Sequence, residues 1–428
     1  MHYVLATIGS LGDLHPMLAL GLELNRRRHR VVIATIETHR VAVQAAGLEF
    51  APMRPHFKIE PERVRWLFDP TWGPRRLLRD LIFPQVEAMY EDLAAIARSA
   101  DGLVAGEIVY AAPLLAEKTG LPYTYYCTAP SSLISAYDPP VLAPAPYLRY
   151  LRFFGRTPHQ VLYRVLRAAS RPWGKPVSEL RRKLGLSLDP HPAFEGKFSP
   201  TLNLIGFSPV FAAPQPDWPV NSVQPGFLFY DGSLEQGLPE AVERFLAAGE
   251  PPIVFTLGSS AVYLQTDFYV HAIAATQQLR RRAVLLVGKN RLRSRVPGSI
   301  LVWDYLPFSQ VFSRAGIVVH QGGAGTCGQV LKAGVPSVVV PFGFDQLDNA
   351  SRLKRLGISE TVPRSKLSPA RLAGAIQQVE SNPGAIGRAQ GVAAVMRNEP
   401  GVAAAANAVD RWDLMRRRLI TTRHHRSE

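Results

Sequence analysis

The chain has 428 residues, of which 47% are hydrophobic and 19% charged, a balance typical of a globular protein with more than one core. The two cysteines, Cys127 and Cys327, are far apart and lack metal-ligand neighbours, which excludes a disulfide scaffold and fits a reducing compartment. Lys and Arg outnumber Asp and Glu by 49 to 34, but no nucleic-acid-binding motif accompanies the basic clusters, so no nucleic acid is expected as a partner.

The opening segment Met1–Ile8 has neither a basic n-region nor a cleavage site, and no stretch approaches the roughly 20 apolar residues of a membrane span. A cytoplasmic protein is therefore expected. The net charge of +15 leaves two interpretations open. The basic side chains either cover solvated helix faces or hold the protein peripherally at an anionic inner membrane surface.

The first half of the chain alternates short apolar runs with helical patterns. The runs Tyr3–Ile8 and Val31–Thr35 predict strands, and the spacing of apolar residues predicts a helix over Pro16–Arg28 between them. Such alternation is typical of a parallel sheet covered by helices on both faces. Two stretches rich in Pro, Arg and aromatic residues, at about 54–87 and 137–176, interrupt the pattern and are interpreted as pocket walls and lids.

A proline-rich passage, Phe211–Pro219, resembles an interdomain linker, and a second alternation follows it. The strands expected there are Pro252–Leu257, Val284–Val287, Ile317–Val319 and Ser337–Val340. The fold class is therefore α/β, with two facing Rossmann-like doubly wound domains and a ligand cleft at the carboxyl ends of their strands. We expect domains at 1–215 and 216–402, followed by a helix within 403–428 that packs back across the junction.

A glycine-rich turn follows the strand that ends at His320, and a helix is expected to begin near Thr326. Unpaired N–H groups at a helix N-terminus suit a pyrophosphate, and glycines let the backbone approach the anion. His320 can donate a hydrogen bond to an α-phosphate oxygen. The candidate anion-binding residues of the turn are Gly322, Gly323, Ala324, Gly325 and Thr326.

The segment Gly323–Gly328 also reads G-x-G-x-x-G, the dinucleotide fingerprint, which would make the chain an NAD-dependent oxidoreductase. That fingerprint normally opens its domain, whereas three expected strands precede it here. Asp345 follows the strand end at Val340 by five residues, too far along the loop to hold a ribose at the strand tip. This alternative is disfavoured.

The residues from His320 to Asn349 resemble the donor signature of GT-B inverting glycosyltransferases of family 1. Nearly the full length is similar to the catalytic chains of bacterial rhamnolipid rhamnosyltransferases. The stretches that carry this resemblance are Gly9–Pro16, Asp69–Trp72, Leu180–Gly185, Pro216–Pro219, Tyr230–Ser233, Gly334–Pro336 and Pro341–Gln346. The resemblance implies transfer of a sugar from a nucleotide diphosphate.

The resemblance places the catalytic base in the first loop, where plant members have a histidine three residues before the loop proline. Counting back from Pro16 gives Asp13, whose carboxylate can take the acceptor proton directly. The position of the histidine's usual acidic partner falls at about Gly106, so Asp13 is expected to act alone. The competing interpretation of Asp13 is a helix N-cap. Ser10 in the same turn is a candidate donor contact.

On the donor side, the resemblance implies that Ser259 touches the diphosphate, and that Asp345 and Gln346 bind sugar hydroxyls. Tyr305 occupies the place of the aromatic residue that stacks on the base, with Trp303 as the rival. Candidate acceptor contacts are His15, Trp72 and Phe83.

Many family members carry a ribose-binding glutamate eight residues after the histidine, where this chain has Gly328. Because a thymidine nucleotide lacks the 2′-hydroxyl, this difference favours a dTDP-sugar over a UDP-sugar. No D-x-D motif is present, so neither a metal nor a cofactor is expected, and the nucleotide-sugar is a co-substrate.

The expected function is transfer of L-rhamnose from dTDP-rhamnose onto a hydroxyl of a hydroxyalkanoyl lipid. The alternative acceptors are a polyketide, flavonoid or sterol. An alternative of another class is a non-catalytic partner protein that binds the nucleotide-sugar.

Overall fold

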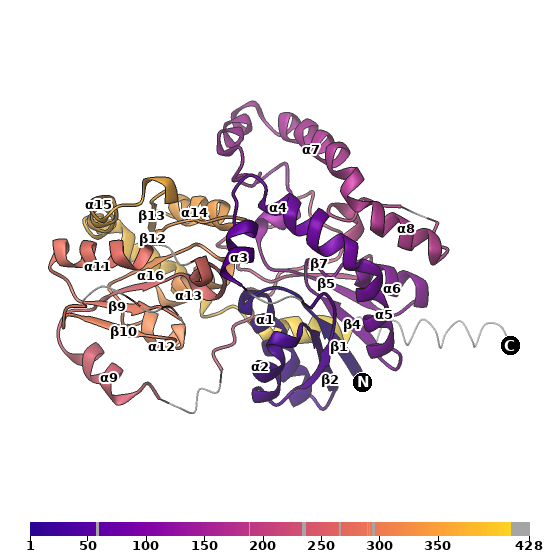
Figure 1. The fold of residues 1–428 in the computed structure, drawn as a ribbon, viewed down its shortest axis with the longest axis horizontal. Helices are drawn as coiled ribbons and strands as arrows, with labels where there is room; N and C mark the ends of the chain where they lie inside the picture. Colours follow the sequence, from indigo (N-terminus) through magenta and orange to yellow (C-terminus); the bar gives the residue numbers. More distant parts are fainter. Residues whose placement is uncertain are drawn as a thin grey trace.

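The computed structural model describes residues 1–56, 60–187, 189–232, 237–264, 267–288, 290, 292 and 296–411. The side chain of Ser260 is outside this description. Within these ranges the chain forms two α/β domains that lie side by side (Figure 1). In the described part of the chain, no helix is both long and apolar enough to cross a membrane.

The N-terminal domain contains a seven-stranded sheet in the order β3-β2-β1-β4-β5-β6-β7, and every pair of neighbours is parallel. The strands are β1 (His2–Ala6), β2 (Arg30–Thr35), β3 (Glu49–Pro52), β4 (Gly102–Ala105), β5 (Tyr123–Cys127), β6 (Leu202–Ile205) and β7 (Ser222–Val223). The strand order reverses between β1 and β4. Ligands of doubly wound sheets bind outside the carboxyl ends of the strands at such a point.

The C-terminal domain contains a six-stranded parallel sheet in the order β10-β9-β8-β11-β12-β13. The strands are β8 (Ile253–Thr256), β9 (Ala283–Leu286), β10 (Ile300–Trp303), β11 (Ile317–His320), β12 (Ser337–Val339) and β13 (Ser359–Thr361). Here the order reverses between β8 and β11. The prediction of two doubly wound domains is therefore confirmed.

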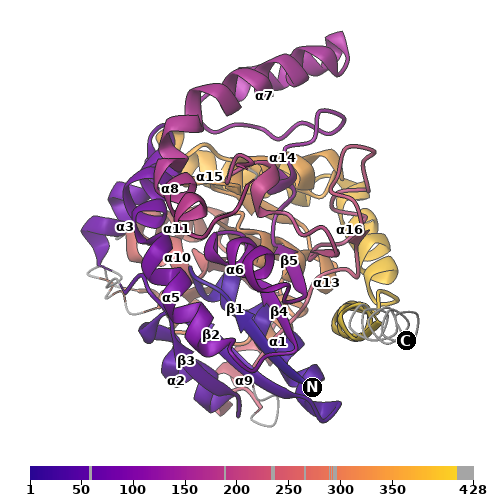
Figure 2. The same ribbon diagram turned by 90° about the vertical axis from the view of Figure 1, so that its right-hand side faces the viewer.

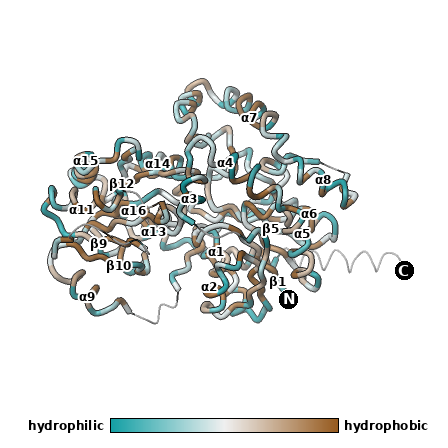
Figure 3. The backbone as a smooth tube through the Cα atoms, in the orientation of Figure 1, coloured by the Kyte–Doolittle hydropathy of each residue, from teal (hydrophilic) through white to brown (hydrophobic). Residues whose placement is uncertain are grey.

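The helices cover both faces of each sheet (Figures 1 and 2). They are α1 (Leu11–Arg26), α2 (Arg40–Ala45), α3 (Pro61–Leu67), α4 (Gly73–Arg75), α5 (Val86–Ile96), α6 (Ala111–Thr119), α7 (Thr157–Ser170), α8 (Lys175–Lys183), α9 (Glu240–Ala247), α10 (Gly258–Ala261), α11 (Phe268–Leu279), α12 (Phe308–Phe312), α13 (Ala324–Ala333), α14 (Gln346–Arg355), α15 (Pro369–Glu380) and α16 (Pro383–Met396). Because the strands are covered twice, every residue of β4, β5, β8 and β11 is buried, and the hydrophobic colouring follows the two sheets (Figure 3).

Helix α1 begins one turn earlier than the predicted start at Pro16. Ser10 caps the helix and accepts a hydrogen bond from the Gly12 N–H at 3.1 Å, so the helix starts at Leu11. Pro16 then lies inside α1, where it lacks the N–H that would bond the carbonyl of Gly12. The favourable cap outweighs this single missing bond in the second turn.

The domain boundary lies further along the chain than expected at 215 and 216. Strand β7, at residues 222–223, pairs with β6 and so extends the N-terminal sheet beyond the proline-rich passage. The two interruptions of the first half also contain helices. The stretch 54–87 contains α3, α4 and a π-helix, η2 (Arg76–Ile82), and the stretch 137–176 contains a 3-10 helix, η5 (Pro146–Phe154), followed by α7.

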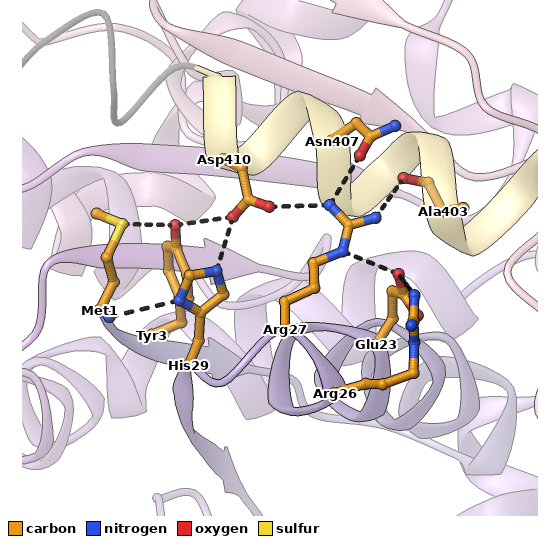
Figure 4. A network of polar contacts seen from close by, with 9 residues as sticks. All are labelled: Met1, Tyr3, Glu23, Arg26, Arg27, His29, Ala403, Asn407 and Asp410. Carbon is orange, nitrogen blue, oxygen red and sulfur yellow. Dashed lines mark hydrogen bonds and ion pairs between the residues drawn. The ribbon is translucent and has the colours of Figure 1, made fainter.

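Residues 401–411 form a helix that crosses back to the N-terminal domain (Figure 4). Asp410 accepts hydrogen bonds from Arg27 Nη1 at 2.9 Å and from the Tyr3 hydroxyl at 3.3 Å. Asn407 accepts a second bond from Arg27 at 2.8 Å. Ala405 and Ala406 are fully buried in the same hydrophobic cluster as β1 and α1. The end of the described chain therefore ties the two domains together.

A buried charge network also joins the domains. Arg352 on α14 is 2% exposed and donates to Asp348 at 2.8 Å and to Asp138 of the N-terminal domain. Asp348 in turn accepts the N–H of Val141 at 3.0 Å. A buried charge needs such partners, since removing one of them leaves the other uncompensated. The loop before η5 is therefore fixed against the C-terminal domain.

Candidate functional site

The first loop of the site follows β1 and contains Ser10 and Asp13. The Ser10 N–H and hydroxyl both donate to Asp13 Oδ2, at 2.8 and 3.1 Å. Gly9 has φ = +131°, and a Cβ at this position would lie 2.3 Å from Asp13 Oδ2. Only glycine fits there, because any side chain would displace the carboxylate.

The hydrogen bonds between Ser10 and Asp13 form a capping box at the start of α1. Ser10 is the N-cap residue of this box, and Asp13 is the third residue of the helix, not the N-cap.

Burial, together with the nearby charge of Glu107, raises the pKa of Asp13 to about 6, although the hydrogen bonds from Ser10 oppose the shift. A carboxyl group with this pKa is ionised at neutral pH yet basic enough to accept a proton. These properties are compatible with the predicted role of Asp13 as a general base.

Glu107 lies at the carboxyl end of β4, next to the position counted as Gly106. Its carboxylate accepts hydrogen bonds from the Thr128 N–H at 2.6 Å and the Thr128 hydroxyl at 2.7 Å, and also from the hydroxyl of Ser132. An acidic neighbour of Asp13 is therefore present, one residue from where the resemblance places it. Counting along the chain missed it because the exact length of a strand–helix connection is not fixed by sequence pattern.

Two histidines surround the first loop. His39 is buried, and its Nε2 lies 3.0 Å from the carbonyl oxygen of Gly9, so it holds the loop from behind. The ring of His15 lies 5.3 Å from that of Tyr230, and burial lowers the pKa of His15 to about 4. His15 is therefore neutral and faces the segment that leads into the C-terminal domain. Nothing in the sequence pattern singled out His39.

The glycine turn after β11 places a hydrogen-bond donor without a partner in the interior. His320 is fully buried, and burial lowers its pKa to about 3, so the imidazole is neutral. Its Nδ1 accepts the Gly322 N–H at 3.1 Å, which leaves the proton on Nε2. Among the described residues, none forms a hydrogen bond with Nε2. A buried N–H donor without a partner costs free energy unless a ligand supplies an acceptor.

The start of α13 is open to an anion. Gly323 is the N-cap residue and provides no side-chain cap, and a Cβ on Gly325 would meet no atom within 4 Å. Gly322 has φ = +90°, which allows the chain to turn from β11 into the helix. Ala324 lies in the first turn, while Thr326 is buried and its hydroxyl is 3.3 Å from Gln321 Nε2. The free N–H groups of this turn suit a phosphate group.

Asp345 and Gln346 follow β12 and lie at the start of α14, but their side chains form different hydrogen bonds. Gln346 Oε1 accepts the N–H of Phe342 at 2.8 Å and therefore shapes its own loop. Asp345 Oδ2 accepts from Asn349 Nδ2 at 2.7 Å, and the same Nδ2 donates to the Gly322 carbonyl at 2.9 Å. Asn349 thus couples the loop after β12 to the turn after β11, a contact that the sequence did not reveal.

Burial raises the pKa of Asp345 to about 7, and the charges of Glu107 and Asp13 add to the shift against the hydrogen bond from Asn349. Asp13, Glu107 and Asp345 follow β1, β4 and β12, at the carboxyl ends of these strands. Helix α10, which carries Ser259, contacts α1 across the domain junction. The helices that carry Asp13 and Ser259 are therefore neighbours, and the roles of both residues stay predictions.

The two candidate aromatic residues for base stacking have different surroundings. Tyr305 is 55% exposed and lies 6.3 Å, between ring centroids, from Phe308. Trp303 is partly buried and packs against the hydrophobic cluster beside α12. Tyr305 therefore has the free surface that stacking requires, and Asp231, which accepts from Gln329 Nε2 at 2.9 Å, lies close enough to influence its pKa.

The acceptor-side candidates separate clearly. Trp72 is 48% exposed, with the Arg75 guanidinium 5.4 Å from its ring centroid. Phe83 has no exposed surface and packs edge-on against Tyr110 at 4.9 Å. The expectation that Phe83 contacts the acceptor is therefore corrected, because its side chain belongs to the core of the N-terminal domain.

Known protein families match both halves of the chain. Residues 3–133 match the glycosyltransferase family 28 N-terminal domain, and residues 281–410 match the erythromycin biosynthesis protein CIII-like C-terminal domain. The chain is 33% identical to O-mycaminosyltylonolide 6-deoxyallosyltransferase of Streptomyces fradiae, over 96% of this chain and 97% of that protein. It is 28% identical to a sterol 3-beta-glucosyltransferase of Arabidopsis thaliana, over 95% of this chain and 65% of that protein.

Solved structures share the fold. The spinosyn rhamnosyltransferase SpnG complexed with thymidine diphosphate superposes with a TM-score of 0.70 and 17% identity, over 96% of this chain and 100% of that chain. The glycosyltransferase SnogD from Streptomyces nogalater gives a TM-score of 0.69 and 21% identity, over 96% and 99% of the two chains.

Proposed function

The chain belongs to the GT-B glycosyltransferases of families 1 and 28. We propose that it transfers a 6-deoxyhexose from a dTDP-sugar to a hydroxyl of a hydrophobic acceptor. L-Rhamnose is the first candidate for the transferred sugar. The observation that carries this proposal is the pairing of two loops, each at the carboxyl end of a strand: Asp13 lies on α1, which contacts α10 of the other domain, and Asn349 joins Asp345 to the turn after His320. A base and a phosphate-binding turn on opposite sides are what a direct sugar transfer requires.

In the proposed reaction, Asp13 accepts the proton of the acceptor hydroxyl as its oxygen attacks the anomeric carbon. The bond from that carbon to the diphosphate oxygen breaks, and dTDP leaves with the electron pair. Both Ser10 hydrogen bonds go to Asp13 Oδ2, so Oδ1 serves as the proton acceptor. One displacement inverts the configuration and needs no enzyme nucleophile.

The leaving diphosphate gains charge as the bond breaks. We propose that His320 Nε2–H and the N–H groups at the start of α13 stabilise this charge, with Ser259 from the facing loop. Donors that are fixed before the reaction need no reorganisation when the charge develops. Catalysis by these groups alone uses neither a metal nor a cofactor.

The preference for dTDP is proposed from the surroundings of Gly328. A Cβ on this residue would lie 2.8 Å from the ring of Phe227, which is buried. No larger side chain fits there, so this position cannot supply an acceptor to a ribose 2′-hydroxyl. A nucleotide without that hydroxyl loses nothing at this point.

The acceptor is proposed to be a hydroxyalkanoyl lipid, and the excess of basic residues supports peripheral attachment to the inner face of an anionic membrane. A polyketide or sterol acceptor is the second candidate, because the relatives named above are a transferase named for O-mycaminosyltylonolide and a sterol glucosyltransferase. In both cases the acceptor hydroxyl would approach Asp13 past His15 and Trp72.

A panel of dTDP- and UDP-sugars, each incubated with the protein and followed by mass spectrometry, tests the donor assignment. We expect dTDP-L-rhamnose to be consumed faster than UDP-glucose, both by slow hydrolysis and by transfer to added acceptors. Faster use of UDP-glucose would contradict the dTDP assignment. A protein that binds these nucleotides without consuming any of them would instead be a non-catalytic partner.

A further inference from the structure

The most exposed apolar surface of the described chain lies away from the site, on η5 and α7. Figures 1 and 2 show α7 projecting from the body of the N-terminal domain. We call this the η5–α7 surface, and its large exposed apolar side chains are Tyr147, Tyr150, Phe153, Phe154, Val161 and Val165. Phe153 and Phe154 are 71% and 78% exposed. Such a patch on a soluble domain marks an interaction site.

Helix α7 presents one face to the protein and the opposite face outward. His159 and Ser170 are buried, and the Tyr163 hydroxyl donates to the Ser135 carbonyl at 3.2 Å, which fixes the inner face. Val161 and Val165, one turn apart, are 50% and 58% exposed on the other side. The apolar stripe is therefore held outward by the packing of α7.

The charge of this segment has a single sign. Between Pro139 and Ser178 the sequence contains six Arg and one Lys but neither Asp nor Glu. Glu195 and Asp189, from a later segment, pair with Arg167 and Arg171. Among the described residues, no carboxylate pairs with the remaining four arginines, which are Arg149, Arg152, Arg156 and Arg164.

Several of these arginines lie against the aromatic rings. The Arg149 guanidinium is 4.9 Å from the ring centroid of Tyr150, and that of Arg152 is 5.4 Å from the ring centroid of Phe153. Exposed aromatic rings beside arginines that pair with no carboxylate among the described residues match the boundary between lipid headgroups and acyl chains. The cations meet anionic headgroups while the rings enter the apolar layer.

We propose that the η5–α7 surface docks the protein on an anionic lipid bilayer. This assignment rests on the peripheral membrane attachment proposed above and names the surface through which the protein attaches. The loop 128–141, which Glu107 and Asp348 hold beside the site, leads directly into η5. The loop thus connects the site to the docking surface, and as part of this proposal the bound protein takes its acceptor from the lipid bilayer.

Sedimentation with vesicles tests the assignment, using phosphatidylcholine alone and phosphatidylcholine mixed with phosphatidylglycerol. We expect binding only to the anionic vesicles, and less of it at high salt. Phe153→Ser combined with Phe154→Ser, and separately Arg152→Glu combined with Arg164→Glu, should each weaken binding by about tenfold or more.

Matched controls carry the same chemical changes on other faces. Val41→Ser with Ile386→Ser removes exposed apolar surface, and Arg371→Glu with Arg397→Glu reverses exposed charge. Equal loss in the controls and in the η5–α7 variants would overturn the assignment. A dimer in sedimentation velocity that only the η5–α7 variants dissociate would also overturn it, since the surface would then bind a second copy.

Hydrolysis of the nucleotide-sugar by each variant separates this proposal from the proposed function. Unchanged hydrolysis with lost vesicle binding supports the docking surface. Absence of hydrolysis in every form, including the wild type, would contradict the enzymatic assignment while leaving the vesicle result to be judged independently.

Discussion

Ser10 and Asp13 hold each other at the start of α1: the Ser10 N–H donates to Asp13 Oδ2 at 2.8 Å, and the Ser10 hydroxyl does so at 3.1 Å. The same contact caps the helix and fixes one carboxylate oxygen. The structural and the catalytic interpretations of Asp13 are therefore compatible, because the bonds that start the helix also orient the proposed base.

The pH dependence of transfer follows from the raised pKa of Asp13. Only the ionised carboxylate can take the acceptor proton, and its pKa is about 6. We expect kcat/KM to decrease by about tenfold for each pH unit below that value. Rates measured across the acid range, with a donor at fixed concentration, give the position of this limb.

Asp345 titrates nearby, with a pKa of about 7, and must be separated from Asp13. The Asp345→Asn variant replaces the carboxyl group by an amide of similar size that does not ionise. Its activity should be lower at every pH while the limb near pH 6 remains. Disappearance of the limb in this variant would assign it to Asp345.

Asp345 also makes a prediction about stability. Its folded pKa is raised by burial, so the folded state keeps the proton to higher pH than the unfolded state does, and stability decreases as pH rises from about 4 through about 7. Asp345→Asn should therefore raise the free energy of unfolding more at about pH 8 than at about pH 5, by on the order of 2 kcal/mol. Urea denaturation at both pH values measures the difference, and an equal effect at both would contradict the buried charge.

Gly9 tests how tightly the first loop is constrained. A Cβ would lie 2.3 Å from Asp13 Oδ2, so Gly9→Ala should displace the carboxylate and lower kcat by about a hundredfold. Gly47 also has positive φ, but a Cβ there meets no atom within 4 Å. Gly47→Ala is thus the control: it should lower the melting temperature with no change in kcat, whereas equal kcat values for both variants would remove the positional role of Gly9.

Much of the fold was predictable because buried parallel strands have an unambiguous apolar pattern. The runs that became β1, β8 and β11 and the glycine turn after His320 are of this kind. The start of α1 was missed because the Ser10–Asp13 cap competes with Pro16, and only the folded geometry shows which one prevails.

The site was predictable where one short motif contains all of its parts, as at His320. Contributions from distant segments were not. Glu107, His39 and Asn349 act through contacts with residues that are 21 to 30 positions away in sequence. Phe83 was wrongly predicted to contact the acceptor. An aromatic residue in an irregular segment can lie in the core as readily as in a pocket wall, and the sequence pattern does not distinguish the two.

His320 makes a prediction about nucleotide binding. Its Nε2–H has no partner within the part of the chain that the structure describes, so a bound diphosphate would accept a hydrogen bond from it. His320→Ala should weaken dTDP binding by about 10- to 100-fold, measured by calorimetry. The control is His191, which is equally buried but is not part of the glycine turn after β11. His191→Ala should destabilise the fold while leaving dTDP affinity unchanged, and similar affinity loss in both variants would refute a direct contact from His320.

The central proposal is that Asp13 acts as the base, and the Asp13→Ala variant tests this role most directly. The measurement is the initial rate of sugar transfer from dTDP-L-rhamnose to an acceptor identified in the mass-spectrometric screen, with dTDP affinity determined on the same samples. We expect transfer to decrease by about a hundredfold or more while dTDP affinity and the melting temperature stay close to those of the wild type. Ordinary transfer by Asp13→Ala would contradict the role of Asp13 as the base.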